Sequence, residues 1–198
     1  MLHLDKYLWS EDNHSMKLFL TPLTLLFFTF QRVYFDNSPT TAHLMNVLLY
    51  ILVSFVLFKL LRRLFPEWHR VFAVLITLLY IVHPIHTEVV SSVKSVDELL
   101  AALFCFSSLF FFIPTKEKKE TSSVLITLGT FLFFLGILSK ESAIAFLIII
   151  PLTYYLFVDS NLKTTLKYFG LLLLSSGLFM FMRYKAIGTA PTNIIDPM

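Results

Sequence analysis

Residues 124–158 read VLITLGTFLFFLGILSKESAIAFLIIIPLTYYLFV, an apolar run that charged residues interrupt at one place, Lys140 and Glu141. Both halves are continuously apolar and lack an alternation of period two, so they predict helices and not strands. The reversal between two such helices needs polar residues, which Ser139–Ser142 supply. Lys140 is expected to pair with Glu141, because pairing lowers the cost of keeping charge near lipid. The stretch therefore predicts a helical hairpin in a membrane.

The composition indicates a membrane protein. The chain has 198 residues, 57% of them hydrophobic and 22 of them Phe, with a mean hydropathy of +0.76. These values exclude an ordinary soluble domain and a disordered chain. The single cysteine, Cys105, excludes a disulfide framework and a cysteine-rich metal site. Without a basic stretch interleaved with aromatic residues, we expect no nucleic-acid partner.

The fold class predicted from the apolar runs is all-α, a polytopic transmembrane helix bundle with about six spans plus one interfacial or half-inserted helix at Leu18–Phe30. An ordinary seventh span is the alternative for Leu18–Phe30. Several runs are shorter than twenty residues, so Trp68, Tyr154 and Tyr168 are expected to extend them at the water interface. The six predicted spans are Leu44–Phe58, Val71–Val82, Leu99–Ile113, Val124–Leu138, Ala143–Val158 and Leu166–Met182.

The basic residues orient the bundle. Nine of the sixteen Lys and Arg residues fall in alternate connections between the runs, which the positive-inside rule assigns to the cytoplasm. We expect a single transmembrane domain, with residues 1–43 as a non-cytoplasmic loop and interfacial helix, 44–182 as the bundle and 183–198 as a non-cytoplasmic tail. The nine residues are Lys59, Arg62, Arg63, Arg70, Lys116, Lys118, Lys119, Lys163 and Lys167.

Ionisable residues gather on the non-cytoplasmic face. His83, His86 and Glu88 follow one span, and Asp97 begins the next. They either cap a loop that Pro84 opens, or line a cavity or ligand site. His83, His86 and Glu88 are also a weak candidate for a divalent metal, since imidazole and carboxylate suit zinc or manganese. Pro84 between the histidines and the lack of a fourth ligand argue against that metal site.

Cations lie on the same face. Lys140 is either part of a simple hairpin tip or a point charge that holds a phosphate. Arg183 and Lys185 follow the last span, where snorkelling or an anionic ligand would explain them. We predict one polar cavity formed by His83, His86, Glu88, Asp97, Lys140 and Arg183, with Glu141 also lining the site.

Four groups of motifs occur in one order along the chain. They are TPLTLLFF with AHLMNVLLY, which holds His43 and Asn46; HPIHTEVVSSVKSVDELLAALF from His83; LSKESAIAF from Leu138; and RYKAIGTAP with IIDPM from Arg183. This ordered set, covering Asp5 to Pro197, resembles the transmembrane and tetratricopeptide-repeat O-mannosyltransferases and their prokaryotic relatives in the GT-C glycosyltransferase superfamily.

The resemblance implies a membrane glycosyltransferase. Its donor would be a polyprenyl-phosphate sugar, and mannose would pass with inversion to a hydroxyl group of a protein or glycan. The family carries its catalytic base after an earlier transmembrane helix, so the base is expected upstream of Met1. This chain alone is then expected to be inactive while keeping affinity for the donor. The family's arginine before Leu-Thr is also missing at Leu20–Pro22.

Two further readings remain open from the sequence. A non-catalytic membrane subunit or scaffold could bind a lipid-linked sugar, whereas a transporter is disfavoured because the charges lie at one membrane face. The short loops and the lack of a repeat domain favour a bacterial plasma membrane over the endoplasmic reticulum.

Overall fold

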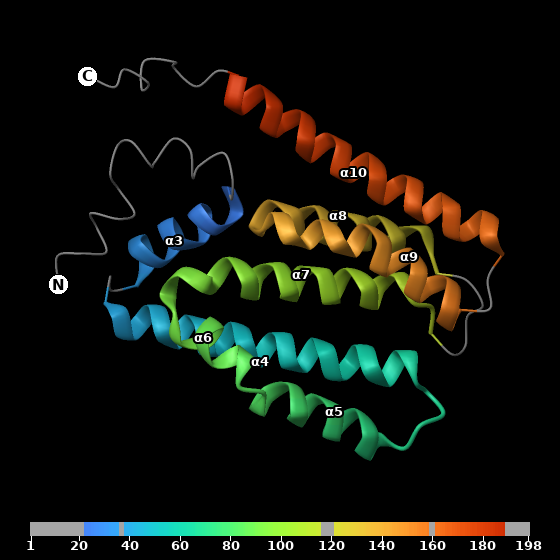
Figure 1. Ribbon diagram of the computed structural model, residues 1–198, viewed down its shortest axis with the longest axis horizontal. Coiled ribbons are helices and arrows are strands. Elements are labelled where there is room, and N and C mark those ends of the chain that lie inside the picture. Colours follow the sequence, from blue (N-terminus) through green and yellow to red (C-terminus); the bar gives the residue numbers. More distant parts are fainter. Residues whose placement is uncertain (1–21, 36–37, 116–120, 159–160, 189–198) are drawn as a thin grey trace.

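The computed structural model describes residues 22–35, 38–115, 121–158 and 161–188, and the side chains of the last segment as far as Lys185. These described residues form helices and no strand, which confirms the all-α class. With the labels of Figure 1, the elements are α3 (Pro22–Tyr34), α4 (Pro39–Leu64), α5 (Arg70–Val82), α6 (Ile85–Ser91), η1 (Val93–Ser95), α7 (Val96–Phe112), α8 (Ser123–Ser139), η2 (Glu141–Ala145), α9 (Phe146–Phe157) and α10 (Leu162–Gly188).

The long helices run alternately in opposite directions. Figure 1 shows α7 between α4 and α8, with α5 packed outside α4 and α10 lying across α8 and α9. The connections from α5 to α7 and from α8 to α9 therefore lie at one end of the bundle with the C-terminal part of α10; we call it the polar end. The opposite end, where α4, α7 and α9 end and α5, α8 and α10 begin, is called the basic end.

Local sequence signals explain where two of the helices begin and end. Ser38 caps α4, since its hydroxyl accepts a hydrogen bond from the N–H of Thr41 at 3.2 Å, and Pro39 occupies the first turn. Pro84 stands between α5 and α6, which are bent by 65° relative to each other. A proline lacks the N–H that would continue the first helix, so the chain turns there.

The predicted count of six spans is not confirmed. By length and composition, three helical segments of the described chain can cross a membrane, Pro39–Leu64, Val93–Phe112 and Leu162–Lys185; the bent pair α5 and α6 would be a fourth if it forms one broken span. The apolar segments Ser123–Ser139 and Glu141–Phe157 are shorter. At 1.5 Å per residue, α8 measures roughly 26 Å against a hydrocarbon core of about 30 Å.

The predicted interfacial segment Leu18–Phe30 is helical where it is described, from Pro22 onward. At 13 residues, α3 is too short to cross a bilayer alone. Its buried residues are Thr24 and Gln31, whereas Leu26 and Phe30 are more than half exposed. An interfacial position for this helix stays a prediction.

Helices α7 and α8 approach each other closely because α8 presents glycines to α7. A Cβ atom added to Gly136 would lie 2.8 Å from Cys105 Sγ, and one added to Gly129 would lie 2.9 Å from the Phe112 ring. The two glycines are seven residues apart, so they share one face of α8. Ser108 adds a bond between the helices, its hydroxyl donating to the carbonyl of Gly129 at 2.7 Å.

The core lies where α7, α8, α9 and α10 meet. Tyr154 and Tyr168 are 1% and 3% exposed, and their ring centroids are 4.8 Å apart. The bundle therefore encloses both rings, and their expected position at the level of the water interface stays a prediction. Trp68, by contrast, is half exposed at the basic end.

A first prediction concerns the close packing of α7 on α8. Gly136→Ala should destabilise the chain by about 1–3 kcal/mol, because the new methyl group overlaps Cys105 Sγ in a packed interior. Adding Cys105→Ala should recover most of the loss, since it removes the overlapping sulfur. Thermal unfolding in detergent measures both variants. Gly170→Ala is the control, because nothing lies within 4 Å of its added Cβ. Equal stability of Gly136→Ala and Gly170→Ala would contradict the prediction.

A second prediction concerns topology. Single cysteines at the exposed positions Ser91, at the polar end, and Ser122, at the basic end, should react with a membrane-impermeant maleimide from opposite sides of the membrane. The native Cys105 is fully buried and supplies a silent background. Labelling of both positions from the same side would overturn the alternating arrangement.

Candidate functional site at the polar end

Lys140 lies at the corner between α8 and η2. Its backbone is extended, with φ −153° and ψ 135°, and is held by hydrogen bonds from Lys140 N to the carbonyl of Gly136 and from Ala143 N to the carbonyl of Lys140, each 3.1 Å. The α8 side of the corner is also tied to α3, because the Thr24 hydroxyl donates to the carbonyl of Ser139 at 3.1 Å. The corner therefore holds the base of the Lys140 side chain in a fixed position.

Two carboxylates from the first turn of α7 surround the Lys140 ammonium group. Lys140 Nζ lies 2.5 Å from Glu98 Oε1 and 3.4 Å from Asp97 Oδ2. Burial lowers the pKa of Lys140, but the hydrogen bond to Glu98 and the charges of Asp97 and Glu98 outweigh burial and raise the pKa above its ordinary value. Lys140 is therefore firmly cationic at neutral pH.

Glu141 pairs with α10 and not with its neighbour. Arg183 Nη1 lies 2.6 Å from Glu141 Oε2. The expected Lys140–Glu141 pair is wrong, because the extended backbone at Lys140 sends successive side chains in different directions. Each member of the expected pair instead joins a different helix, so the corner is connected to both α7 and α10.

A second cluster at this end consists of aromatic and histidine rings. Tyr50 of α4 stacks on Tyr80 with ring centroids 5.8 Å apart, and His86 lies 4.2 Å from the Tyr80 ring. The Tyr50 hydroxyl is 3.1 Å from each of the carbonyl oxygens of Tyr80 and Ile81, where α5 ends. This hydroxyl therefore satisfies backbone groups that the break at Pro84 frees.

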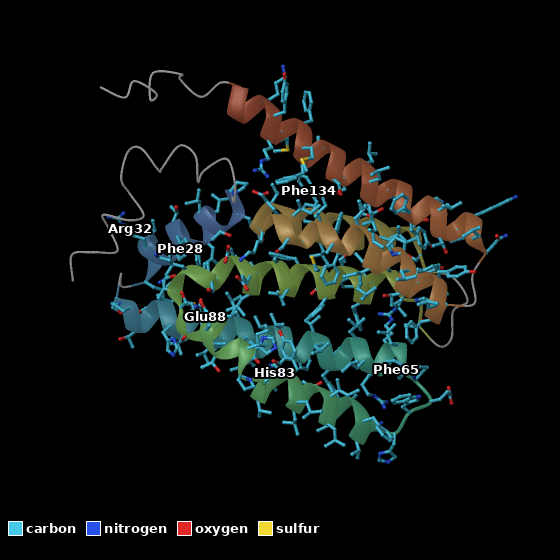
Figure 2. All side chains as sticks on the ribbon, viewed as in Figure 1. Phe28, Arg32, Phe65, His83, Glu88 and Phe134 are labelled. Atoms are coloured by element: carbon cyan, nitrogen blue, oxygen red, sulfur yellow. The ribbon has the colours of Figure 1, made fainter. Side chains whose placement is uncertain are left out.

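His83 and Glu88 lie at the edge of this cluster. Figure 2 labels His83 at the corner between α5 and α6, and Glu88 on α6; both side chains are exposed. The His83 and His86 centroids are 6.0 Å apart. Across the part of the chain that the structure describes, no three His, Cys, Asp or Glu side chains come close enough to hold a metal ion. The weak metal candidate of His83, His86 and Glu88 is therefore not assembled here.

The segment between the two clusters is anchored to α4. Asn46 is 1% exposed, and its side-chain amide donates to the carbonyl of Ser92 at 2.9 Å. Ser92 lies between α6 and η1, just ahead of Asp97. One buried amide thus fixes the chain that leads from the histidines to the carboxylates.

The residues predicted from the sequence share one end of the bundle in two groups. Asp97 and Lys140 are in contact, as are Glu141 and Arg183, whereas His83, His86 and Glu88 lie near α4 and α5. A single cavity formed by all of them stays a prediction. The sequence analysis missed Tyr50 and Tyr80 as site residues. Tyr80 lies near the end of its apolar run and Tyr50 near the middle of its own, so nothing in the sequence indicated that the two rings meet.

The ion pairs of Lys140 and Arg183 are partly exposed to solvent. Two sets of ion pairs meet at the corner: Lys140 with Asp97 and Glu98, and Arg183 with Glu141. The Lys140, Asp97 and Arg183 side chains are 30%, 23% and 23% exposed. Such a group can exchange one of its carboxylates for another anion, or position a polar ligand at the edge of the membrane.

Comparison with known proteins identifies the family to which this chain is similar. Residues 20–189 match the family of dolichyl-phosphate-mannose-protein mannosyltransferases. The human protein O-mannosyl-transferase TMTC3 is 32% identical over 126 residues, which are 62% of this chain and 13% of that protein. The mouse protein O-mannosyl-transferase TMTC4 is 30% identical over 167 residues, which are 71% of this chain and 22% of that protein.

The organisms of these relatives also bear on the expectation that the chain lies in a bacterial membrane. A Caenorhabditis elegans protein O-mannosyl-transferase, F38B6.6, is 27% identical over 126 residues, 62% of this chain and 17% of that protein. Since these relatives come from animals, the expected preference for a bacterial membrane has no support. The chain spans a minor part of the length of each, and no solved structure matches it significantly. From the match over residues 20–189, the chain belongs to the dolichyl-phosphate-mannose-protein mannosyltransferase family.

Proposed function

We propose that the chain forms part of a polytopic membrane glycosyltransferase. It would transfer mannose from a polyprenyl-phosphate donor to a hydroxyl group of a protein or glycan acceptor, with inversion at the anomeric carbon. Family membership supports the reaction class. The observation that carries the proposal is that two neighbouring residues of the α8–η2 corner form ion pairs at the polar end, Lys140 with carboxylates of α7 and Glu141 with Arg183 of α10.

Lys140 and Arg183 are the groups that would hold the donor phosphate. Both are engaged by carboxylates, so an incoming phosphate has to replace one of these partners. Asp97 is the more distant partner of Lys140, at 3.4 Å, and the Glu141 side chain is 49% exposed. Each cation thus has a carboxylate that can turn toward water, while Glu98 keeps Lys140 in position.

The same cations would act during the transfer. The acceptor oxygen attacks the anomeric carbon from the side opposite the phosphate, the bond from carbon to phosphate oxygen breaks, and the acceptor proton passes to a base. Fixed positive charge stabilises the negative charge that develops on the departing lipid phosphate. We assign Asp97 to support of the donor site, because it is already bound to Lys140. The same role for Glu88, which lies in the other cluster, rests on the sequence motif alone.

The reaction would take place on the non-cytoplasmic side. Among the described residues, the basic end holds six of the nine basic residues that the positive-inside rule assigns to the cytoplasm. The polar end would then face the opposite compartment, where the headgroup of the donor lipid and the acceptor hydroxyl can both reach the charged group.

The third prediction tests donor binding. Lys140→Met should weaken binding of a short-chain polyprenyl-phosphate mannose about ten- to hundredfold, because a hydrogen bond to a charged group contributes roughly 1.5–3 kcal/mol. Arg183→Met should weaken it over the same range. Fluorescence competition with the full chain in lipid nanodiscs measures the affinity.

Two variants serve as controls. Lys140→Arg keeps the positive charge and should retain most of the affinity. Lys163→Met removes a charge from the exposed start of α10 at the basic end and should leave binding unchanged. Unchanged binding in both Lys140→Met and Arg183→Met would refute the proposed donor site.

A further inference from the structure

A second charged site lies at the basic end, remote from the residues of the proposed donor site. A pocket of about 400 Å³ opens between the last turns of α4 and the end of α7. Its polar lining comes mainly from three cations, and aromatic and proline rings complete the wall. The lining residues are Lys59, Arg62, Arg63, Pro66, Phe110 and Thr115.

The three cations share one side of α4. Lys59 precedes Arg62 and Arg63 by three and four residues, the spacing that places side chains on the same helix face. Like charges at this spacing repel one another, so their clustering opposes helix stability unless an anion compensates it. Within the described part of the chain, none of the three forms an ion pair with a carboxylate.

One of these cations is held in place by contacts other than ion pairs. The Arg63 guanidinium lies over the Phe110 ring, 4.4 Å from its centroid, and Arg63 Nε donates to the carbonyl of Pro114 at 3.4 Å. These contacts use the flat face and one N–H of the guanidinium. Its remaining N–H groups can therefore bind an anion in the pocket.

We propose that this basic pocket binds the phosphate of an anionic membrane lipid. Arginine binds phosphate through paired N–H donors, and lysine adds a point charge. The pocket lies where α4 ends, at the level where a spanning helix meets the headgroups. Basic pockets between helices on the cytoplasmic side are typical sites for anionic headgroups.

A neighbouring crevice favours a lipid over a soluble anion. Arg62 also lines a small apolar crevice formed mainly by side chains of α4, the α4–α5 connection and α5. Phe65, labelled at this end in Figure 2, lies there beside the half-exposed Trp68. A tryptophan at a helix end is typical of the headgroup level. A lipid can place its phosphate against Arg62 and its glycerol backbone against these rings, whereas a soluble anion gains nothing from them.

The experiment compares two pairs of charges at the same end of the molecule. The full chain is reconstituted in phosphatidylcholine nanodiscs that contain a small fraction of phosphatidic acid, and native mass spectrometry counts the lipids that remain bound. Wild-type chain should retain one phosphatidic acid preferentially. The double variant Arg62→Gln, Arg63→Gln should lower this retention at least about tenfold, whereas Lys163→Gln, Lys167→Gln should not lower it.

Crosslinking and competition measurements test the same proposal without relying on the double variant. A photoreactive phosphatidic acid should crosslink to residues 59–66 or 110–115 of the wild-type chain, which requires no variant to fold. Equal losses in both double variants, or crosslinks elsewhere, would overturn the proposal. Inorganic phosphate that displaces the lipid at equal concentration would assign the pocket to a soluble anion and overturn it as well. Retention unaffected by Lys140→Met would separate this site from the donor site.

Discussion

The close approach of α7 and α8 sets the geometry on which the polar end depends. Gly136 faces Cys105 and Ala101 across the interface. Because the helices are antiparallel, moving one turn along each of them from Ala101 and Gly136 leads to Asp97 and Lys140. The absence of a side chain at Gly136 therefore fixes how near the lysine comes to its carboxylates. A wider separation would leave a half-buried ammonium group without partners, which is costly near lipid.

The two ends of the bundle handle charge differently. At the polar end Lys140 and Arg183 each pair with a carboxylate from another element, so these charges join the helices together. At the basic end Arg63 is held by a ring and a carbonyl oxygen, and Lys59 lies over the Phe55 ring at 5.4 Å. The bulk of the outward surface between the ends is apolar, as a lipid-facing surface requires. Lys140 and Arg183 are thus compensated by carboxylates of the chain, whereas Arg63 and Lys59 are held by aromatic rings.

The helices could be predicted from the sequence because continuous apolarity and the break at Pro84 are local signals. Each of the six apolar runs forms helical structure except at the last residue of two of them, Ile113 and Val158, although α4 begins at Pro39 and α10 continues to Gly188. The pairing of Lys140 could not be predicted, since it depends on the register of α7 against α8. The Tyr50–Tyr80 contact likewise depends on how α5 folds back onto α4. The count of six spans is not confirmed, because α8 is an apolar helix that is short for a bilayer.

The two partners of each ion pair at the α8–η2 corner are synthesised in a fixed order. A ribosome releases the chain from its N-terminus, so Glu98 emerges 42 residues before Lys140, and Glu141 emerges before Arg183. In both ion pairs the acidic residue is synthesised before the basic residue that it binds. The hairpin of α7 and α8 can neutralise its own charges before α9 and α10 exist, and α10 then docks onto a carboxylate already positioned by that hairpin. Membrane insertion can therefore proceed helix by helix, with each new cation finding its partner in place.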